Sequence, residues 1–112
     1  MITIIQGESF PILISLKNGK EPLKPKDVAD LMVCLDTISK KHSDGDIKFI
    51  EESEKWEFFP TQEDTKNTTP GFHSLWVTIK YAGGIVRKLE GQRISVKESK
   101  CEAVLLRKLN SR

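Results

Sequence analysis

The chain has 112 residues, 38% of them hydrophobic and 30% charged, a composition typical of a soluble globular protein, and its length predicts a single domain over residues 1–112. Its 18 basic and 16 acidic residues are interspersed and give a net charge of only +2, which does not favour nucleic acid as a partner. No apolar run approaches the roughly 20 residues of a membrane helix, and the first residues lack the pattern of a signal peptide, so we expect no membrane segment and no export.

Alternation of apolar and polar residues predicts two strands near the N-terminus. Residues 2–5, ITII, indicate a short leading strand that ends before Gly7. In residues 10–16, FPILISL, every second side chain is apolar, which predicts a strand that ends at the turn NG. Pro11 has no N–H to donate, so it is expected at an edge or a bulge of the sheet.

A loop and a third strand follow. Residues 20–30, KEPLKPKDVAD, contain two prolines and a cluster of charges, so we expect a loop with one helical turn at residues 25–28. Leu31, Val33 and Leu35 then alternate with less apolar neighbours, which predicts a strand.

The middle of the chain predicts a hairpin and a capped turn. Residues 47–49, IKF, and 56–58, WEF, alternate in the same way and are joined by a charged linker, which is typical of two paired strands. In TQEDT, Thr61 occupies the position of a helix cap, and Asp64 stands where the answering side chain is expected. The sequence TTPG follows closely, so we expect a single helical turn.

Residues 72–81 form the clearest predicted strand, in which one side is apolar: Leu75, Val77, Ile79 and Tyr81. Gly83 and Gly84 then predict a two-residue type I′ turn, since glycine adopts positive φ without steric cost. Residues 85–89 return the chain beside this strand.

A second turn is predicted at residues 90–92, EGQ, before a last strand around Ile94 and Val96. Residues 101–109, CEAVLLRKL, are either a short C-terminal helix or a final strand, and residues 107–112 are expected to be a loose tail. Seven or eight short strands at even spacing predict an all-β fold, an antiparallel β-sandwich or barrel.

The residue pattern predicts no catalytic, cofactor or metal site. His42 lies in the polar turn KKHSDGD, where we expect it to be solvated, and the DGD that follows lacks the ligands of a calcium loop. His73 and Ser74 are neighbours on one strand and point to opposite faces, which excludes a base–nucleophile pair. Cys34 is expected to be a buried thiol, and both it and Cys101 are expected to be reduced.

Two interpretations are open for the basic region of the last predicted strands. Trp76 and Tyr81 are close in sequence to Lys80, Arg87, Lys88 and Arg93. A basic sheet face with aromatic rings is one way to hold single-stranded nucleic acid. The other interpretation is a solvated outer face, whose charges prevent edge-to-edge aggregation.

Three segments carry a family resemblance. The opening GESFPILISLKNGKEPL has a glycine, an acid, a small residue and an aromatic before an alternating strand and a polar loop. WEFFPTQEDTKNTTPGFHSLWVTIKYAGGIV joins an apolar strand, an acidic turn led by threonine, a proline-glycine pair and a glycine hairpin, and ISVKESKCEAVLL follows. In these features the chain resembles the small immunoglobulin-like domains of tailed-phage and prophage structural proteins, such as the N-terminal domain of upper-baseplate proteins.

The resemblance implies an immunoglobulin-like antiparallel β-sandwich without catalytic residues. It predicts a non-enzymatic structural or assembly protein that works by protein–protein contact in a tail or baseplate, with other proteins or as a homo-oligomer. Such a protein is made in the cytoplasm of a bacterial host and ends in the virion.

The candidate contact residues are aromatic or apolar: Trp76, Tyr81, Val104, Leu105 and Leu106. The same side chains could instead fill the domain's own core. The alternative function is a carbohydrate- or nucleic-acid-binding β-sandwich module, in which Trp76 and Tyr81 form a platform together with the neighbouring basic side chains.

Overall fold

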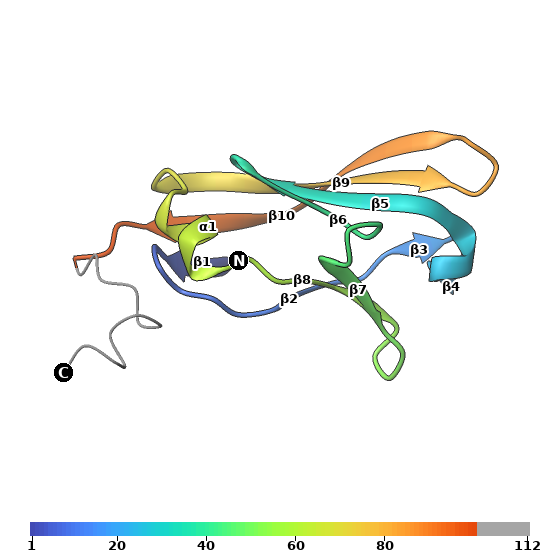
Figure 1. Cartoon of the computed structure of the whole chain (residues 1–112), viewed down its shortest axis with the longest axis horizontal. Coiled ribbons are helices and arrows are strands. Elements are labelled where there is room, and N and C mark those ends of the chain that lie inside the picture. The colour runs from blue at the N-terminus through green and yellow to red at the C-terminus, as the bar shows by residue number, and fades with distance from the viewer. Residues whose placement is uncertain (101–112) are drawn as a thin grey trace.

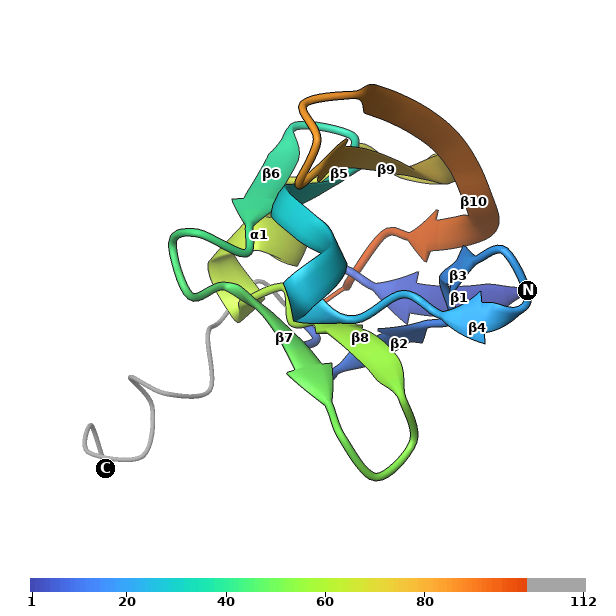
Figure 2. The same ribbon diagram turned by 90° about the vertical axis from the view of Figure 1, so that its right-hand side faces the viewer.

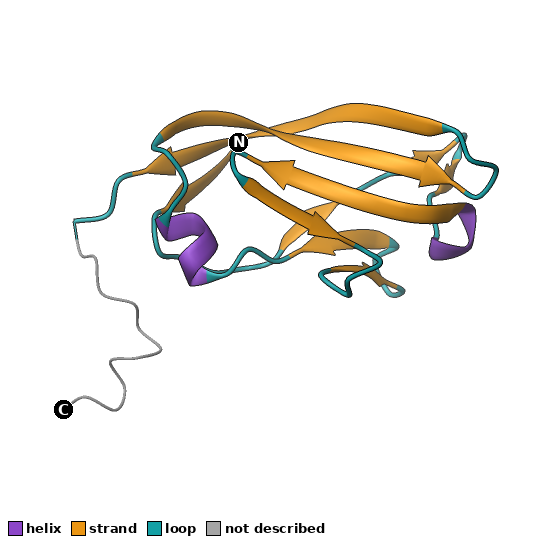
Figure 3. Ribbon diagram, turned by 45° about the horizontal axis from the view of Figure 1, so that its top comes forward, coloured by secondary structure: helices purple, strands orange, loops and turns teal. Residues whose placement is uncertain are grey.

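The computed structural model describes residues 1–100, which form two packed β-sheets and a small separate hairpin (Figures 1 and 3). The predicted helix or strand at 101–109 and the predicted tail at 107–112 lie outside these residues. Two short helices interrupt the strands: the 3₁₀-helix η1, Pro25–Asp27, and the α-helix α1, Gln62–Lys66. The strands are β1 Ile2–Ile5, β2 Ile12–Ile14, β3 Lys17–Asn18, β4 Glu21–Pro22, β5 Val28–Leu35, β6 Ile38–Lys41, β7 Ile47–Ile50, β8 Lys55–Phe58, β9 Gly71–Tyr81 and β10 Val86–Lys97.

The strands divide between two layers, as Figure 2 shows. The larger sheet has the order β1-β10-β9-β5-β6, the smaller sheet has the order β2-β8-β7, and β3 and β4 pair with each other. The last two strands share a sheet with β1, β5 and β6, while β2, which precedes the β5-β6 hairpin, and β7 and β8, which follow it, form the other layer. This is the arrangement of an immunoglobulin-like sandwich, and its eight main strands agree with the predicted seven or eight.

One strand pair corrects the prediction of a fully antiparallel fold. β1 runs parallel to β10, with Ile2 opposite Ile94 and Ile4 opposite Val96. Nearly the whole domain lies between these two strands, so no hairpin fixes their relative direction.

The predicted inward faces are confirmed. Leu31, Val33 and Leu35 of β5 are buried against the smaller sheet, and the predicted hairpin of β7 and β8 places Ile47 opposite Phe58. A period of two residues therefore positions the core in both layers. The buried apolar side chains are Ile4, Ile12, Ile14, Leu16, Leu23, Leu31, Val33, Leu35, Ile38, Ile47, Trp56, Phe58, Leu75, Val77, Ile79, Ile94 and Val96.

The turn predicted at residues 90–92 is wrong, because β10 continues through it as one strand. The pairing register with β9 shifts between Glu90 and Arg93, which marks a β-bulge. A Cβ atom on Gly91 would lie 3.0 Å from the carbonyl oxygen of Leu75. Glycine is therefore needed here for a close approach of two backbones, and not for a turn.

The type I′ turn predicted at Gly83 and Gly84 is also wrong in its geometry. The N–H of Tyr81 donates to the carbonyl of Ile85 (2.8 Å), so three residues form the loop. Only Gly84 has a positive φ, of 97°, whereas type I′ needs two such residues. The hairpin itself is present, and its three-residue loop closes on Gly84.

Trp56 lies at the centre of the core and is completely buried. Its indole N–H donates to the carbonyl of Leu23 (2.9 Å), which satisfies both polar groups in the interior. The rings of His42 and Phe49 pack edge-on against it, with centroids 5.1 and 5.3 Å away. One side chain of β8 thus contacts the loop before η1, the loop after β6 and the neighbouring strand β7.

The predicted capped turn is the helix α1. The hydroxyl of Thr61 accepts the N–H of Asp64 (3.1 Å), and the carboxylate of Asp64 accepts the N–H of Thr61 (2.9 Å). Thr65 is buried, and its hydroxyl donates to the carbonyl of Glu8 (2.7 Å) and accepts the N–H of Gly7 (3.0 Å). These bonds attach α1 to the loop that follows β1.

We predict that Trp56→Phe lowers the free energy of unfolding by about 2–4 kcal/mol, because it leaves the buried carbonyl of Leu23 without a donor and opens a cavity. Trp76→Phe is the matched control, since that side chain is 45% exposed, and it should change stability by less than about 0.5 kcal/mol. Urea denaturation followed by circular dichroism measures both. Equal losses in the two variants would contradict this account of the core.

We predict that Asp64 contributes to acid sensitivity. Its burial acts to raise the pKa, but hydrogen bonds from Thr61 and from Lys40, whose ammonium lies 3.0 Å away, lower the pKa overall. A carboxylate with a lowered pKa in the folded state stabilises the fold at neutral pH, and this contribution is lost as the pH falls below about 4. Asp64→Asn should therefore cost about 1 kcal/mol at pH 7 and flatten the loss of stability between about pH 4 and 2.

Denaturation curves at a series of pH values measure this effect. Asp44→Asn removes a carboxylate from an exposed turn and controls for the change in net charge. If Asp64→Asn left both the stability at pH 7 and its pH dependence unchanged, the proposed role of the cap would be wrong.

Candidate interaction surface

The outer face of the larger sheet, which points away from the core, carries large apolar side chains on its three central strands. They are Met32 of β5, Phe72 and Trp76 of β9, and Val86 of β10. Phe72 is 61% exposed, Val86 54% and Trp76 45%, whereas Met32 is half-buried. On β5 and β9 these positions alternate with more buried residues, so the pleat of the sheet directs them outwards, and Val86 of β10 pairs with Lys80 of the same face. Aromatic side chains exposed in this way are typical of protein interfaces.

Charged residues of both signs surround these apolar side chains. The guanidinium of Arg93 lies over the ring of Phe72, 5.5 Å from its centroid, in the geometry of a cation–π contact. Glu90 lies opposite Trp76 and accepts the hydroxyl of Ser74. Lys80 and Lys88 belong to the same face, opposite Val86 and Thr78, whereas Arg87 pairs with the buried Ile79 and belongs to the other face.

A hollow of about 190 Å³ lies at one end of the outer face, lined by Asp30, Leu31, Met32, Lys41, Thr78, Lys80 and Val86. Burial acts to raise the pKa of Asp30, but the hydroxyl of Ser43 (2.8 Å) and the N–H groups of Leu31 and Ser43 hold the pKa below its usual value. The carboxylate is therefore ionised at neutral pH and faces the neighbouring lysines. With about 190 Å³ the hollow is smaller than typical small-molecule pockets.

The structure does not bring the predicted contact residues together. Trp76 is on the outer face, while Tyr81 belongs to the inward-facing set of β9 and packs, half-buried, against the core. The two rings therefore do not form one platform. Val104, Leu105 and Leu106 lie outside the described residues.

Two side chains differ from their predicted environments. His42 is half-buried and not simply solvated: its Nδ1–H donates to the carbonyl of Ile47 (2.7 Å), and its ring packs on Trp56. Cys34 is only half-buried, because it lies on the outer face opposite Trp76, with its Sγ 3.7 Å from the hydroxyl of Ser39.

The side chains of His73 and Ser74 point to opposite faces of β9, as predicted. The Nε2–H of His73 donates to the carbonyl of Thr69 (2.6 Å), and its Nδ1 lies 3.9 Å from the carboxylate of Asp36. Ser74 donates to Glu90 on the other face of the sheet. Across residues 1–100, no three His, Cys, Asp or Glu side chains are grouped so that they could hold a metal ion.

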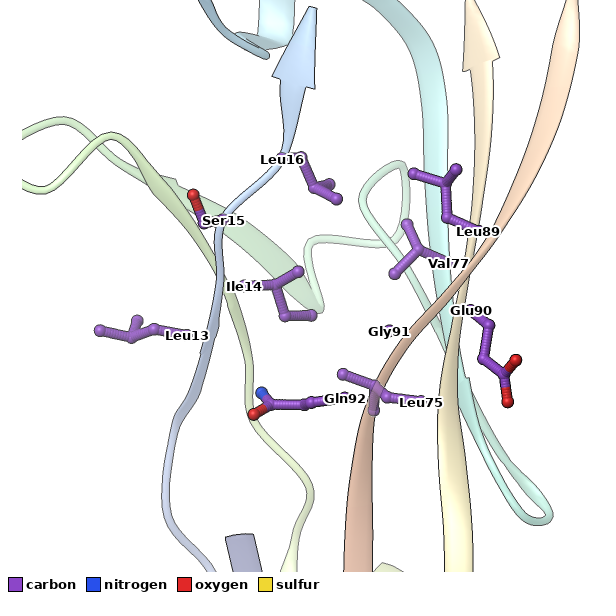
Figure 4. A pocket seen from close by; sticks show the side chains of 10 residues that line it. All are labelled: Leu13, Ile14, Ser15, Leu16, Leu75, Val77, Leu89, Glu90, Gly91 and Gln92. Atoms are coloured by element: carbon purple, nitrogen blue, oxygen red, sulfur yellow. The ribbon is translucent and has the colours of Figure 1, made fainter. Parts of the chain in front are cut away.

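A groove of about 480 Å³ opens at one side of the sandwich, between β10 and the chain around β2 (Figure 4). Ile14 and Leu16 face it from one layer, and Leu75, Val77 and Leu89 face it from the other, while Leu13 and Glu90 point away. Leu89 is 39% exposed. The groove is therefore an apolar extension of the core that reaches solvent.

Comparisons with models of protein families, with characterised proteins and with solved structures found no match to this chain. In the described part of the chain, neither helix has the length and apolar character needed to cross a membrane. The geometry alone therefore has to carry the functional argument.

Sequence reasoning found Trp76 but missed three members of the outer face. Phe72 is not among the predicted contact residues, although its alternation with Leu75 and Val77 places it on the outer side of the strand. Met32 and Val86 become neighbours only because β5 and β10 lie on the two sides of β9. No local pattern could have shown that they line one hollow.

Proposed function

We propose that this chain is a non-enzymatic structural or assembly protein of phage or prophage origin, which works by protein–protein contact in a tail or baseplate. The observation that carries the proposal is the outer face of the larger sheet. Trp76 and Phe72 remain exposed there, although the inner faces of both sheets already form a complete core without them. Large aromatic side chains left outside a filled core are best explained as anchors for another protein.

The phage or prophage origin is supported by the sequence resemblance alone. The three segments that carry it correspond to β2 with the β3-β4 hairpin, to the chain from β8 to β10, and to the end of β10. An immunoglobulin-like sandwich hosts many functions, so the fold adds a compatible scaffold and no more.

In the proposed mode of contact, a partner packs on the outer face around Trp76. Trp76 projects from β9, which lies between β5 and β10. An indole side chain has few rotatable bonds, so little conformational entropy is lost when a partner pocket encloses it. Lys80, Lys88 and Arg93 lie around it on the same face. Asp30 and Glu90 also lie on this face, so it favours a partner whose rim carries charges of both signs, because opposite charges at the edge of an interface steer association.

The test is whether the chain is part of tailed particles. Particles purified from the bacterium that carries the gene should contain the chain at a fixed ratio to the other tail proteins in a quantitative immunoblot. Trp76→Asp should keep the fold, since the side chain is exposed, but reduce the amount incorporated at least about tenfold, because it puts a charge where an apolar anchor is needed.

Lys20→Asp is the matched control, since Lys20 is exposed in the β3-β4 turn, away from the outer face. It should be incorporated like the natural chain. If the chain were missing from particles, or if Trp76→Asp were incorporated as well as the control, the proposed function would be wrong.

The second candidate function is a carbohydrate- or nucleic-acid-binding module. The contact between Arg93 and Phe72 favours it, because it forms a basic and aromatic surface on the same face as Trp76. Tyr81 does not contribute, since it belongs to the inner side.

We expect that oligothymidylate and mixed oligosaccharides leave the fluorescence of Trp76 unchanged, because the face also carries Asp30 and Glu90. Titrations at low and high salt measure this, with Trp76→Phe as the control that leaves only the buried Trp56. Quenching by oligothymidylate that disappears at high salt, or quenching by a sugar, and that is absent in Trp76→Phe, would instead support the binding module.

A further inference from the structure

Half of β10 has a free edge. β1 pairs only with the segment that begins at Ile94, and within residues 1–100 no strand pairs with that side of residues 86–92. The N–H of Tyr81 donates to the carbonyl of Ile85, so the alternation of antiparallel bonds directs the backbone groups of Val86, Lys88 and Glu90 away from β9. This free edge is about 23 Å long, long enough to pair with another strand.

The groove lies directly beneath this free edge. Leu89 pairs with Val77 and belongs to the inner side of the sheet, where it lines the groove together with Ile14 and Leu16. Figure 4 shows these side chains converging from the two layers. A strand added beside β10 would direct every second side chain towards this groove, so an apolar residue at that position would bury apolar surface there.

The charge pattern along the edge identifies the strand that fits. When two copies of β10 pair in antiparallel fashion about Leu89, Lys88 of each copy lies opposite Glu90 of the other, and the two Leu89 side chains meet over the groove. Opposite charges that face each other directly across two strands are favourable. A register centred on Lys88 would instead bring two ammonium groups together, so the sequence itself selects the register on Leu89.

We propose that the free edge of β10 pairs with the same edge of a second copy, centred on Leu89, to form a two-fold symmetric dimer with one continuous ten-stranded sheet. The number of strands follows from two copies of the five-stranded sheet. The inference rests on the proposal that the domain works by protein contact. It adds that one partner is a second copy of the chain and that the two strands pair in the register centred on Leu89. The contact is isologous, because each copy contributes the same residues.

The test is the solution mass of the natural chain over a range of concentrations, measured by sedimentation equilibrium. We expect a reversible dimer. Lys88→Glu and Glu90→Lys, each alone, should weaken it about tenfold or more, since each places like charges opposite each other twice per dimer. A mixture of the two variants should form a heterodimer about as strong as the natural dimer, because every carboxylate at the two positions of one variant then faces an ammonium group of the other.

Three controls make the outcome specific. The double variant Lys88→Glu with Glu90→Lys should dimerise like the natural chain, and Lys20→Glu should have no effect. Circular dichroism checks that each variant is folded. A natural chain that stays monomeric at every concentration would overturn the proposal and indicate that the charge of Lys88 prevents edge-to-edge association. The proposal would also be overturned if the charge variants left the dimer affinity unchanged. The same holds if a single variant weakened the dimer and the mixture of the two variants did not restore its affinity.

The failure of this inference and the failure of the proposed function are distinguishable. Trp76→Asp should leave the dimer intact, because its side chain lies beyond Glu90 on the outer face and not at the edge. A dimer lost in Trp76→Asp but insensitive to the charge at positions 88 and 90 would assign self-association to the outer face and overturn edge pairing. Incorporation into particles is a separate measurement, and a monomeric chain that is still incorporated would overturn only the dimer.

Discussion

The hydrogen bond from the indole of Trp56 to the carbonyl of Leu23 is the contact on which the rest of the sandwich depends. It lies in the centre of the core and joins β8 of the smaller sheet to the loop that leads through η1 into β5 of the larger sheet. His42, just after β6, packs on the same indole and holds its own ring by a bond to Ile47. A polar bond inside an apolar core is costly to break and has few alternatives, so it fixes how the two layers meet.

Two regions of the described chain do not contribute side chains to this buried core. Among residues 1–100, the outer face keeps Trp76 and Phe72 exposed, and the first half of β10 extends past β1 with one edge that no described strand pairs and an open groove below it. Small sandwiches usually cover, shorten or charge such edges. Here the edge carries Lys88 and Glu90. Their order disfavours antiparallel pairing of two copies centred on Lys88 and favours pairing centred on Leu89.

The sequence predicted the inner faces well, because a period of two residues reports directly which side of a strand is buried. It failed where a residue's role is decided by a distant strand. The segment EGQ has the composition of a turn, but Gly91 is there because the backbone of Leu75 approaches it closely. His42 stands in a polar loop and still packs on Trp56, since the fold brings residues 14 positions apart together. The parallel direction of β1 and the alignment of Met32 with Val86 depend on sheet order, which local patterns do not contain.

Edge pairing and face contact would reinforce each other. The two-fold axis of an antiparallel strand pair is perpendicular to the sheet, so a dimer through β10 places both outer faces on the same side of one continuous surface. Each dimer then presents two copies of Trp76 in a fixed relation. A partner with matching repeats would be held at two points, and the second contact would form at a high effective concentration without any new type of interaction. In that arrangement the free edge would convert a small contact through the outer face into one strong enough for a stable assembly, which a monomer with the same outer face could not do.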